Sequence, residues 1–326
     1  MGSHKTNPMK IVFKLVLFGM IVFNCLHATA QDSNSAIPAI QEIFKQFDNV
    51  RDFTLSNSGD EAYFTGQSPL AEVSVIFKIS KINGSWQKPK LVPFSGKSND
   101  LEPFLSPDNL RLYFVSNRQL YDTASQLNYD IWYVERKALS DAWSEPVNLG
   151  PTINTQYDEF YPSVAHNGNL YFTSVRPGMD GKDDIFFSKW ENGQYAEPAT
   201  LSDSVNTDGY EYNAFISPDE SYLIFGAYNR PDGLGSGDLY ISFYREGQWT
   251  KGKNLGNSVN SKWMDYCPFV VGDTLFFTSK RVKEFGKGLE IDSYDNFVER
   301  VVVYENGLSR IYQLPGFLKN LKQSQN

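Results

Sequence analysis

One unit of about 50 residues occurs five times in this chain of 326 residues. It is clearest in DEFYPSVAHNGNLYFTSVR from Asp158 and in the copies that begin at Leu101 and Glu211, and it recurs from Asp265 and, more faintly, from Arg51. The first apolar strand of each copy places at equivalent positions Leu55, Leu105, Val164, Ile216 and Phe269. A unit that repeats at this period cannot bury its apolar face alone, so neighbouring copies must pack against each other.

Each copy has the same internal order. A short strand such as PFLS is followed by a turn of the SPDN or HNGN kind, an apolar strand such as LYFVS, and a third strand such as DIWY. A polar turn (NGSW, ENGQY or REGQW) then leads to a last strand. Four short antiparallel strands per repeat are typical of a propeller blade. We therefore predict an all-β propeller of four-stranded antiparallel blades over residues 50–316, with five blades, six being the alternative, and a C-terminal tail over 317–326.

The units resemble the WD-like repeats of TolB-type β-propellers of bacterial envelope and secreted proteins. The residues that carry the resemblance are Ser106-Pro107-Asp108, Leu112-Tyr113-Phe114, Ser116-Asn117-Arg118, Asp184-Ile185 and Trp143 through Gly150. The resemblance covers most of the chain and implies the propeller fold. It implies no single activity, because this architecture carries many unrelated functions. Five blades would also depart from the six or more of TolB itself.

The first thirty residues have the pattern of a secretory signal peptide. Lys10 and Lys14 flank the start of an apolar run that ends at Leu26, and Ala28-Thr29-Ala30 supplies small residues before Gln31. This pattern predicts cleavage near Ala30 and a periplasmic or secreted protein with no integral membrane segment afterwards. A retained membrane anchor is the alternative.

Residues 31–49 lie between this leader and the first repeat. Within them Ile37, Ile40, Phe44 and Phe47 have the spacing of one helical face. We expect a short helix that plugs or braces the propeller. The same segment is alternatively an extra outer strand that closes the ring.

A second pattern recurs where the inner strand of each unit begins. Three asparagines open an Asn-(Thr/Ser) step that ends in an acid, and an arginine follows the second strand in four of the five copies. Because Arg grips carboxylates and backbone oxygens together, a pattern present in most blades favours a structural ring. The predicted ring consists of Arg118, Arg176, Arg230, Asn154, Asn206 and Asn260. Alternatively, two of the ring acids are a catalytic pair chosen from Asp100, Glu159, Glu211 and Asp265.

Specific function is expected where the copies differ. The first copy has Val50 and Gln67 at the acid and Arg positions, and aromatic residues cluster beside the acids of the later copies. Aromatic faces beside carboxylates are suited to sugars. The predicted ligand-binding rim consists of Asp265, Tyr266, Arg281, Tyr161, Tyr212 and Trp263. The last copy also has an irregular segment from Val282 to Phe297, and its third strand is expected after this segment, at Val301–Val303. Alternatively, Leu289–Ile291 forms the third strand and the extra residues follow it.

The sequence has few residues that could support nucleic-acid binding, a metal site or nucleophilic catalysis. The net charge of −8 argues against a nucleic-acid partner. Of three histidines only His166 lies beyond the leader, so a histidine-based metal site or triad is not expected. Cys267 is expected to be a buried, inert thiol. No metal and no cofactor are predicted.

These observations lead to one expectation of function and one alternative. The expectation is a monomeric, non-catalytic module that binds an envelope or extracellular protein or a glycan. The alternative is a carbohydrate-active hydrolase or lyase that uses two rim carboxylates.

Overall fold

The computed structural model describes residues 1–2, 35–120, 128–176, 182–284 and 290–323. The predicted signal peptide therefore lies outside the described residues apart from its first two. In the described part of the chain, no helix is both long and apolar enough to cross a membrane.

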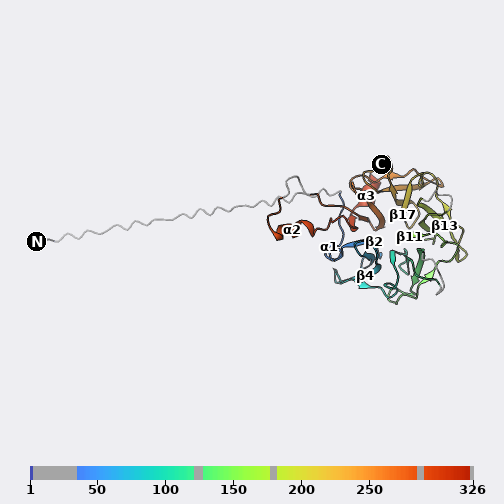
Figure 1. Cartoon of the computed structure of the whole chain (residues 1–326), viewed down its shortest axis with the longest axis horizontal. Helices are drawn as coiled ribbons and strands as arrows, with labels where there is room; N and C mark the ends of the chain where they lie inside the picture. The colour runs from blue at the N-terminus through green and yellow to red at the C-terminus, as the bar shows by residue number, and fades with distance from the viewer. Residues whose placement is uncertain (3–34, 121–127, 177–181, 285–289, 324–326) are drawn as a thin grey trace. The chain divides into compact units, whose positions relative to one another are not determined.

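The structure is a five-bladed β-propeller, as predicted, and each blade is an antiparallel sheet. Figure 1 shows inner strands such as β2, β11 and β17 facing a common centre, with β4 and β13 farther out. The innermost strands are β2 (Asn49–Leu55), β7 (Asp100–Leu105), β11 (Glu159–Val164), β17 (Tyr210–Ile216) and β22 (Asp265–Val271). The second strands are β3 (Glu61–Gln67), β8 (Arg111–Ser116), β12 (Leu170–Ser174), β18 (Tyr222–Tyr228) and β23 (Thr274–Ser279).

The outermost strand of each blade has only two residues. The third strands are β4 (Ser74–Ile82), β9 (Asp130–Glu135), β13 (Asp184–Ser188), β19 (Asp238–Arg245) and β24 (Arg310–Leu314). The outermost strands are β6 (Lys90–Leu91), β10 (Val147–Asn148), β16 (Ala199–Thr200), β21 (Lys253–Asn254) and β1 (Ile37–Pro38). Small hairpins add β5 (Ser85–Trp86), β14 (Trp190–Glu191), β15 (Gln194–Tyr195) and β20 (Gln248–Trp249). We call the face where the inner strands begin the entry face, and the face of the turns between first and second strands the turn face.

The N-terminal segment closes the ring. Strand β1 pairs with β24 of the last blade, so that Ile37 lies opposite Gln313. Pro38 is tolerated there because an outermost strand needs no donor on its free side. The expected helix shortens to α1 (Gln41–Phe44), because Ile37 lies in β1 and Ile40 takes a left-handed backbone with φ 38°. Both readings of this segment therefore apply, each to a different part of it.

The last blade corrects the prediction of its third strand. Val301–Val303 does not form it, because that position belongs to β24, beginning at Arg310. The alternative, Leu289–Ile291, lies partly outside the described residues, and its described residues Glu290 and Ile291 are not in a strand. Val301 instead ends the helix α2 (Tyr294–Val301), whose first turn is capped by Ser293 through a hydrogen bond to its Oγ from Asn296 N. The run of valines has high strand propensity, but the capped amphipathic helix overrides it.

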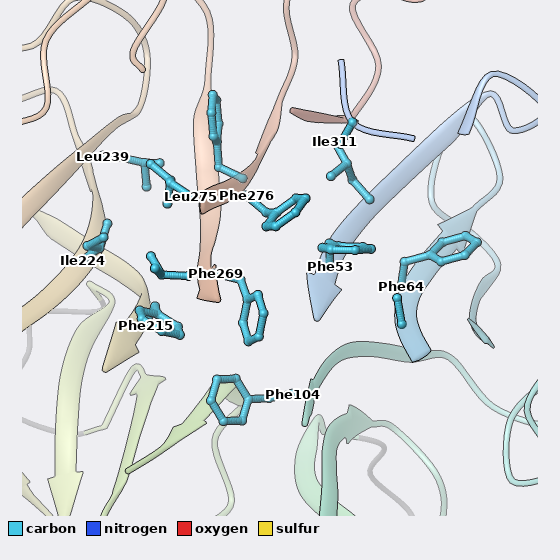
Figure 2. Packing of buried hydrophobic residues seen from close by; sticks show 14 of the residues in the cluster. Phe53, Phe64, Phe104, Phe215, Ile224, Leu239, Phe269, Leu275, Phe276 and Ile311 are labelled. Atoms are coloured by element: carbon cyan, nitrogen blue, oxygen red, sulfur yellow. The ribbon is translucent and has the colours of Figure 1, made fainter. Parts of the chain in front are cut away.

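Aromatic side chains fill the turn-face half of the propeller axis. Phe104, Phe215 and Phe269 come from three different blades and converge in Figure 2, whereas Phe53 of blade 1 packs against Phe276 of blade 5. The ring of Phe269 lies 6.0 Å from that of Phe104 and 5.5 Å from that of Phe215. Because this half is packed with apolar rings, polar chemistry at the axis is confined to the half nearer the entry face.

The helix α1 is expected to contribute strongly to stability through Phe44. This side chain is fully buried, and its ring lies 5.1 Å from Phe64 and 6.0 Å from Phe53. Phe44→Ala should lower the free energy of unfolding by about 3–5 kcal/mol in chemical denaturation. The exposed neighbour Gln41→Ala is the control and should change it by less than about 0.5 kcal/mol. Equal effects of the two substitutions would contradict this role.

Candidate functional site

Every inner strand contains the same irregularity near its beginning. The pairing register with the second strand shifts in all five blades, as between Leu101 and Phe104 in blade 2. The residue at the centre of each shift has a left-handed backbone, with φ between 49° and 57°. These five bulge residues are Asp52, Glu102, Tyr161, Asn213 and Cys267. A β-bulge re-aims a side chain, and its presence in all blades makes it a property of the fold. The five side chains, however, all differ.

The bulge residues form a hydrogen-bonded cluster, which we call the axial cluster together with Arg51. Arg51 bridges the two acids, since Nε lies 2.7 Å from Asp52 Oδ1 and Nη2 lies 2.7 Å from Glu102 Oε1. The other oxygen of Glu102 accepts the Tyr161 N–H at 2.7 Å. Asn213 Nδ2 approaches Glu102 at 3.5 Å. Residues from the first four blades therefore meet at one carboxylate.

The remaining contacts close the cluster. The Glu102 N–H donates to Asp52 Oδ2 at 3.2 Å, and the Cys267 thiol lies 3.5 Å from Asn213 Oδ1. Tyr161 donates its hydroxyl hydrogen to the carbonyl of Pro268 at 2.8 Å. Each blade is thus tied to another through its bulge residue.

The electrostatics of the two acids are dominated by burial. The side chains of Asp52 and Glu102 are only 1% and 3% exposed, whereas Arg51 is 17% exposed. Burial raises the pKa of Glu102 to about 7; the charge of Arg51 opposes this rise and the charge of Asp52 adds to it. Glu102 is therefore substantially protonated near neutral pH. A buried carboxylic acid beside a second carboxylate is the arrangement that acid–base chemistry requires.

The cluster does not suit a metal ion. In the described part of the chain, ligand atoms of Asp52, Glu102 and Cys267 lie within 4.8 Å of one another. The guanidinium of Arg51 already binds both carboxylates and approaches Cys267 Sγ at 3.4 Å. Burial, and then the charge of Asp52, also raises the pKa of the thiol, which opposes formation of a thiolate ligand. The protein's own cation therefore occupies the place that a metal would take.

The recurring acids and arginines form pairs within blades. The Arg-to-acid distances are 2.7 Å for Arg118 and Asp100, 3.7 Å for Arg176 and Glu159, 2.8 Å for Arg230 and Glu211, and 3.4 Å for Arg281 and Asp265. None of the four acid side chains is exposed. Each guanidinium also donates to a backbone carbonyl and lies over aromatic rings, as Arg230 does with Val205 O and Tyr240. A substrate would have to displace all of these contacts to reach an acid of this ring.

The three ring asparagines each bond to both backbone groups of one residue on the neighbouring third strand, and Asn154 and Asn260 also donate to the side chains of Asn148 and Asn254. Asn154 accepts the N–H of Ile131 at 2.8 Å and donates to its carbonyl at 2.9 Å. The same pair of bonds joins Asn206 to Ile185 and Asn260 to Leu239. Each asparagine side chain thus pairs with the third strand as one more strand residue would. The ring acid follows it five residues later in the sequence.

The structure places the predicted rim residues deeper than the rim. Tyr161, Tyr212 and Tyr266 are buried and pack with Cys267 beside the axial cluster. Trp263 is half-buried with Lys262 above its ring, and Arg281 is held by Asp265. In blade 1 Val50 lies opposite Gly66, which makes Ser68 the equivalent of Arg118, while Gln67 bonds to Ser74. Ligand binding at these rim residues remains a prediction.

Sequence reasoning missed Arg51, Asp52, Glu102 and Asn213. A signal for the bulge position was present, because each bulge residue lies two positions after the ring acid or its equivalent. In three copies it precedes a proline: Glu102, Tyr161 and Cys267. At this one place the five copies carry five different side chains, two of them carboxylates, so the residues that the copies share do not reveal it.

No protein-family model and no curated protein match the chain. Among solved structures it is similar to a GH62 hydrolase in complex with xylotriose, with 12% identity and a TM-score of 0.52, over 87% of this chain and 98% of the other. It is also similar to a structure of BT0996 described as an RGII complex, with 11% identity and a TM-score of 0.51, over 81% and 86%. A GH62 α-L-arabinofuranosidase catalytic domain from Coprinopsis cinerea has 11% identity and a TM-score of 0.49, over 86% and 95%.

At these identities the comparisons establish the five-bladed propeller fold. They do not establish membership of the TolB-type family. The expectation of a non-catalytic binding module is contradicted, because a GH62 hydrolase shares this fold over nearly its whole length.

The Arg–acid pairs are expected to hold the blades together. In Arg230→Ala the buried carboxylate of Glu211 loses two hydrogen bonds from its guanidinium partner. The free energy of unfolding should fall by about 3–5 kcal/mol, because an uncompensated charge is left buried. Lys189→Ala, which breaks an exposed pair with Glu191, is the control and should cost less than about 1 kcal/mol. A loss below about 1 kcal/mol in Arg230→Ala would count against the structural role.

Proposed function

We propose that this protein is a carbohydrate-active hydrolase whose two working carboxyl groups are Glu102 and Asp52. The observation that supports this most is the axial cluster itself. The fold provides five equivalent bulges at the axis, and two adjacent ones carry acids whose environments differ. The propeller fold that the chain shares with a GH62 hydrolase supports the same reading.

The two acids suit complementary roles. Glu102, with its pKa raised to about 7, is the general acid that donates a proton to the glycosidic oxygen as the bond to the sugar breaks. Asp52 is the partner carboxylate. Its oxygen lies within 4.8 Å of a Glu102 oxygen, closer than the ~6.5–9.5 Å that leaves room for an intervening water. This spacing favours attack by Asp52 on the anomeric carbon, after which Glu102 takes a proton from the water that releases the sugar.

Arg51 positions this pair. It donates to both carboxylates and is the most exposed of the three side chains, so it lies between the acids and an approaching substrate. Its guanidinium also lies 5.1 Å from the centre of the Tyr266 ring, which fixes its direction. To reach the acids, a hydroxyl group of the incoming sugar must replace one of the two hydrogen bonds that Arg51 donates to them.

The entry face offers a place for the rest of the substrate. A cavity of about 530 Å³ lies there at the seam between blades 1 and 2, the two blades that supply the acids. Val75 of β4 and Val73 just before that strand line one side, and Lys97, Asn99 and Asn117 of blade 2 line the other. This cavity is large enough for a few sugar units.

We retain three further proposals from the sequence. Residues 1–30 are a secretion signal and residues 31–49 a bracing segment, which leads to a periplasmic or secreted enzyme. Residues 50–316 are one propeller domain, followed by the tail 317–326. The chain is related by evolution to the TolB-type propellers, and the pattern of its repeats supports this relationship.

Substitution of either acid is expected to abolish hydrolysis without unfolding the protein. Glu102→Gln and Asp52→Asn preserve side-chain size, and each should lower kcat/KM by about 10²–10⁴-fold. The measurement is reducing-sugar release from a panel of glycans that begins with xylo- and arabino-oligosaccharides. Glu197→Gln, an exposed acid in blade 3, is the control and should leave the rate unchanged. Activity above about one tenth of wild type in folded Glu102→Gln would overturn the assignment.

The pH dependence of the activity follows from the protonation of Glu102. The acid must be protonated, so kcat/KM should fall as pH rises through about 7. Because the charge of Arg51 lowers the pKa of Glu102, Arg51→Met should move this alkaline limb to higher pH. A limb at the same pH in both proteins would show that another group controls it.

A further inference from the structure

A second cavity, of about 400 Å³, lies on the turn face at the seam between blades 2 and 3. Its walls include the turn residues Asp108 and His166 and the aromatic residues Trp190 and Tyr195. The axial cluster belongs to the opposite half of the axis, so this groove is separate from the proposed active site. We call it the seam groove.

The groove exists where a recurring latch between blades is altered. At the seam of blades 1 and 2, Trp143 donates from Nε1 to Tyr63 OH at 2.9 Å. At the seam of blades 3 and 4, Trp249 lies edge-on to Tyr171 with ring centres 6.3 Å apart. At the seam of blades 2 and 3 the latching residue is Tyr195. Across this seam its hydroxyl lies 3.3 Å from the hydroxyl of Tyr113. The smaller ring leaves space that the indole fills elsewhere.

Trp190 supplies a fixed aromatic wall. It begins the small hairpin β14–β15, and its ring centre lies 4.7 Å from that of Tyr195. Its indole lies so close over Gly168 that a Cβ there would stand 2.8 Å from Cδ1. The ring is half-buried, so its orientation is held while part of it faces the groove.

The arginine charges beside the groove are balanced within the protein. Arg111 is bound to Glu135 at 2.8 Å and lies over the ring of Tyr133, with 4.3 Å between its guanidinium carbon and the ring centre. Arg136 is bound to Glu61 at 3.0 Å. An ionic ligand would therefore find no unpaired charge on these described arginines. Carboxylate and guanidinium edges remain available to hydroxyl groups, because Glu135 is 51% exposed.

We propose that the seam groove binds a neutral saccharide, with one sugar ring stacked on Trp190 and its hydroxyl groups bonded to Glu135, Arg111 and His166. The volume accommodates one or two sugar units. A glycan bound on the turn face would anchor the protein to a polymer while the entry face is free to act on it. This inference does not depend on which residues hydrolyse the glycan.

The test is isothermal titration of the folded Glu102→Gln protein, in which turnover is blocked, with xylotriose, arabinotriose, cellotriose and galactotriose. Binding of at least one probe is expected, with a change in the NMR signals of the His166 ring. Trp190→Ala should weaken that binding at least 10-fold. The matched control Trp86→Ala removes the tryptophan of the corresponding hairpin in blade 1 and should leave the affinity unchanged.

A second variant guards against misfolding. Tyr195→Trp restores the residue found at the other two latches, and it should fill the groove, keep the fold and also abolish binding. Binding of no probe, or binding that both variants leave unchanged, would overturn the proposal. Loss of binding together with full hydrolytic activity in Trp190→Ala on the wild-type background would separate this site from the axial one.

Discussion

The β-bulge of the inner strand is the constraint on which the rest of this structure depends. At each bulge the chain adopts a left-handed backbone and turns one side chain toward the axis of the propeller. Such a conformation costs roughly 1 kcal/mol or more for a residue other than glycine, so the surrounding blade must hold it. The Arg–acid pairs and the ring asparagines lie next to the bulges and supply that support. The repeated part of the unit is therefore scaffold, and the variable bulge residue is the part free to acquire chemistry.

The two halves of the axis are used differently. The turn-face half is closed by phenylalanines from several blades, which excludes water and gives the sheets a common core (Figure 2). The other half holds Arg51, Asp52 and Glu102 in a nearly dry setting, where burial outweighs the nearby arginine and keeps Glu102 protonated up to neutral pH. The apolar packing is thus a cause of the acid's altered pKa as well as a source of stability.

The repeat pattern predicted the blades and their number, because apolar alternation and turn chemistry are local properties. It also located the Arg–acid pairs, since these recur in every copy but the first. The repeat pattern could not predict the axial cluster, for a physical reason. Asp52 and Glu102 are 50 residues apart in sequence and meet only because the ring brings successive inner strands together. Likewise β24 was misplaced, because Val301–Val303 has strand propensity but follows a helix that Ser293 caps.

The central claim is that the bulge residues, and not the repeated acids, act on the substrate. The most direct measurement is a crystal structure of the Asp52→Asn, Glu102→Gln protein with a bound oligosaccharide that the wild-type protein hydrolyses. The account predicts a glycosidic oxygen within about 3 Å of the residue at position 102 and the adjoining anomeric carbon facing position 52. A scissile bond placed instead against Asp100, Glu159, Glu211 or Asp265, with the axial cluster untouched, would contradict it.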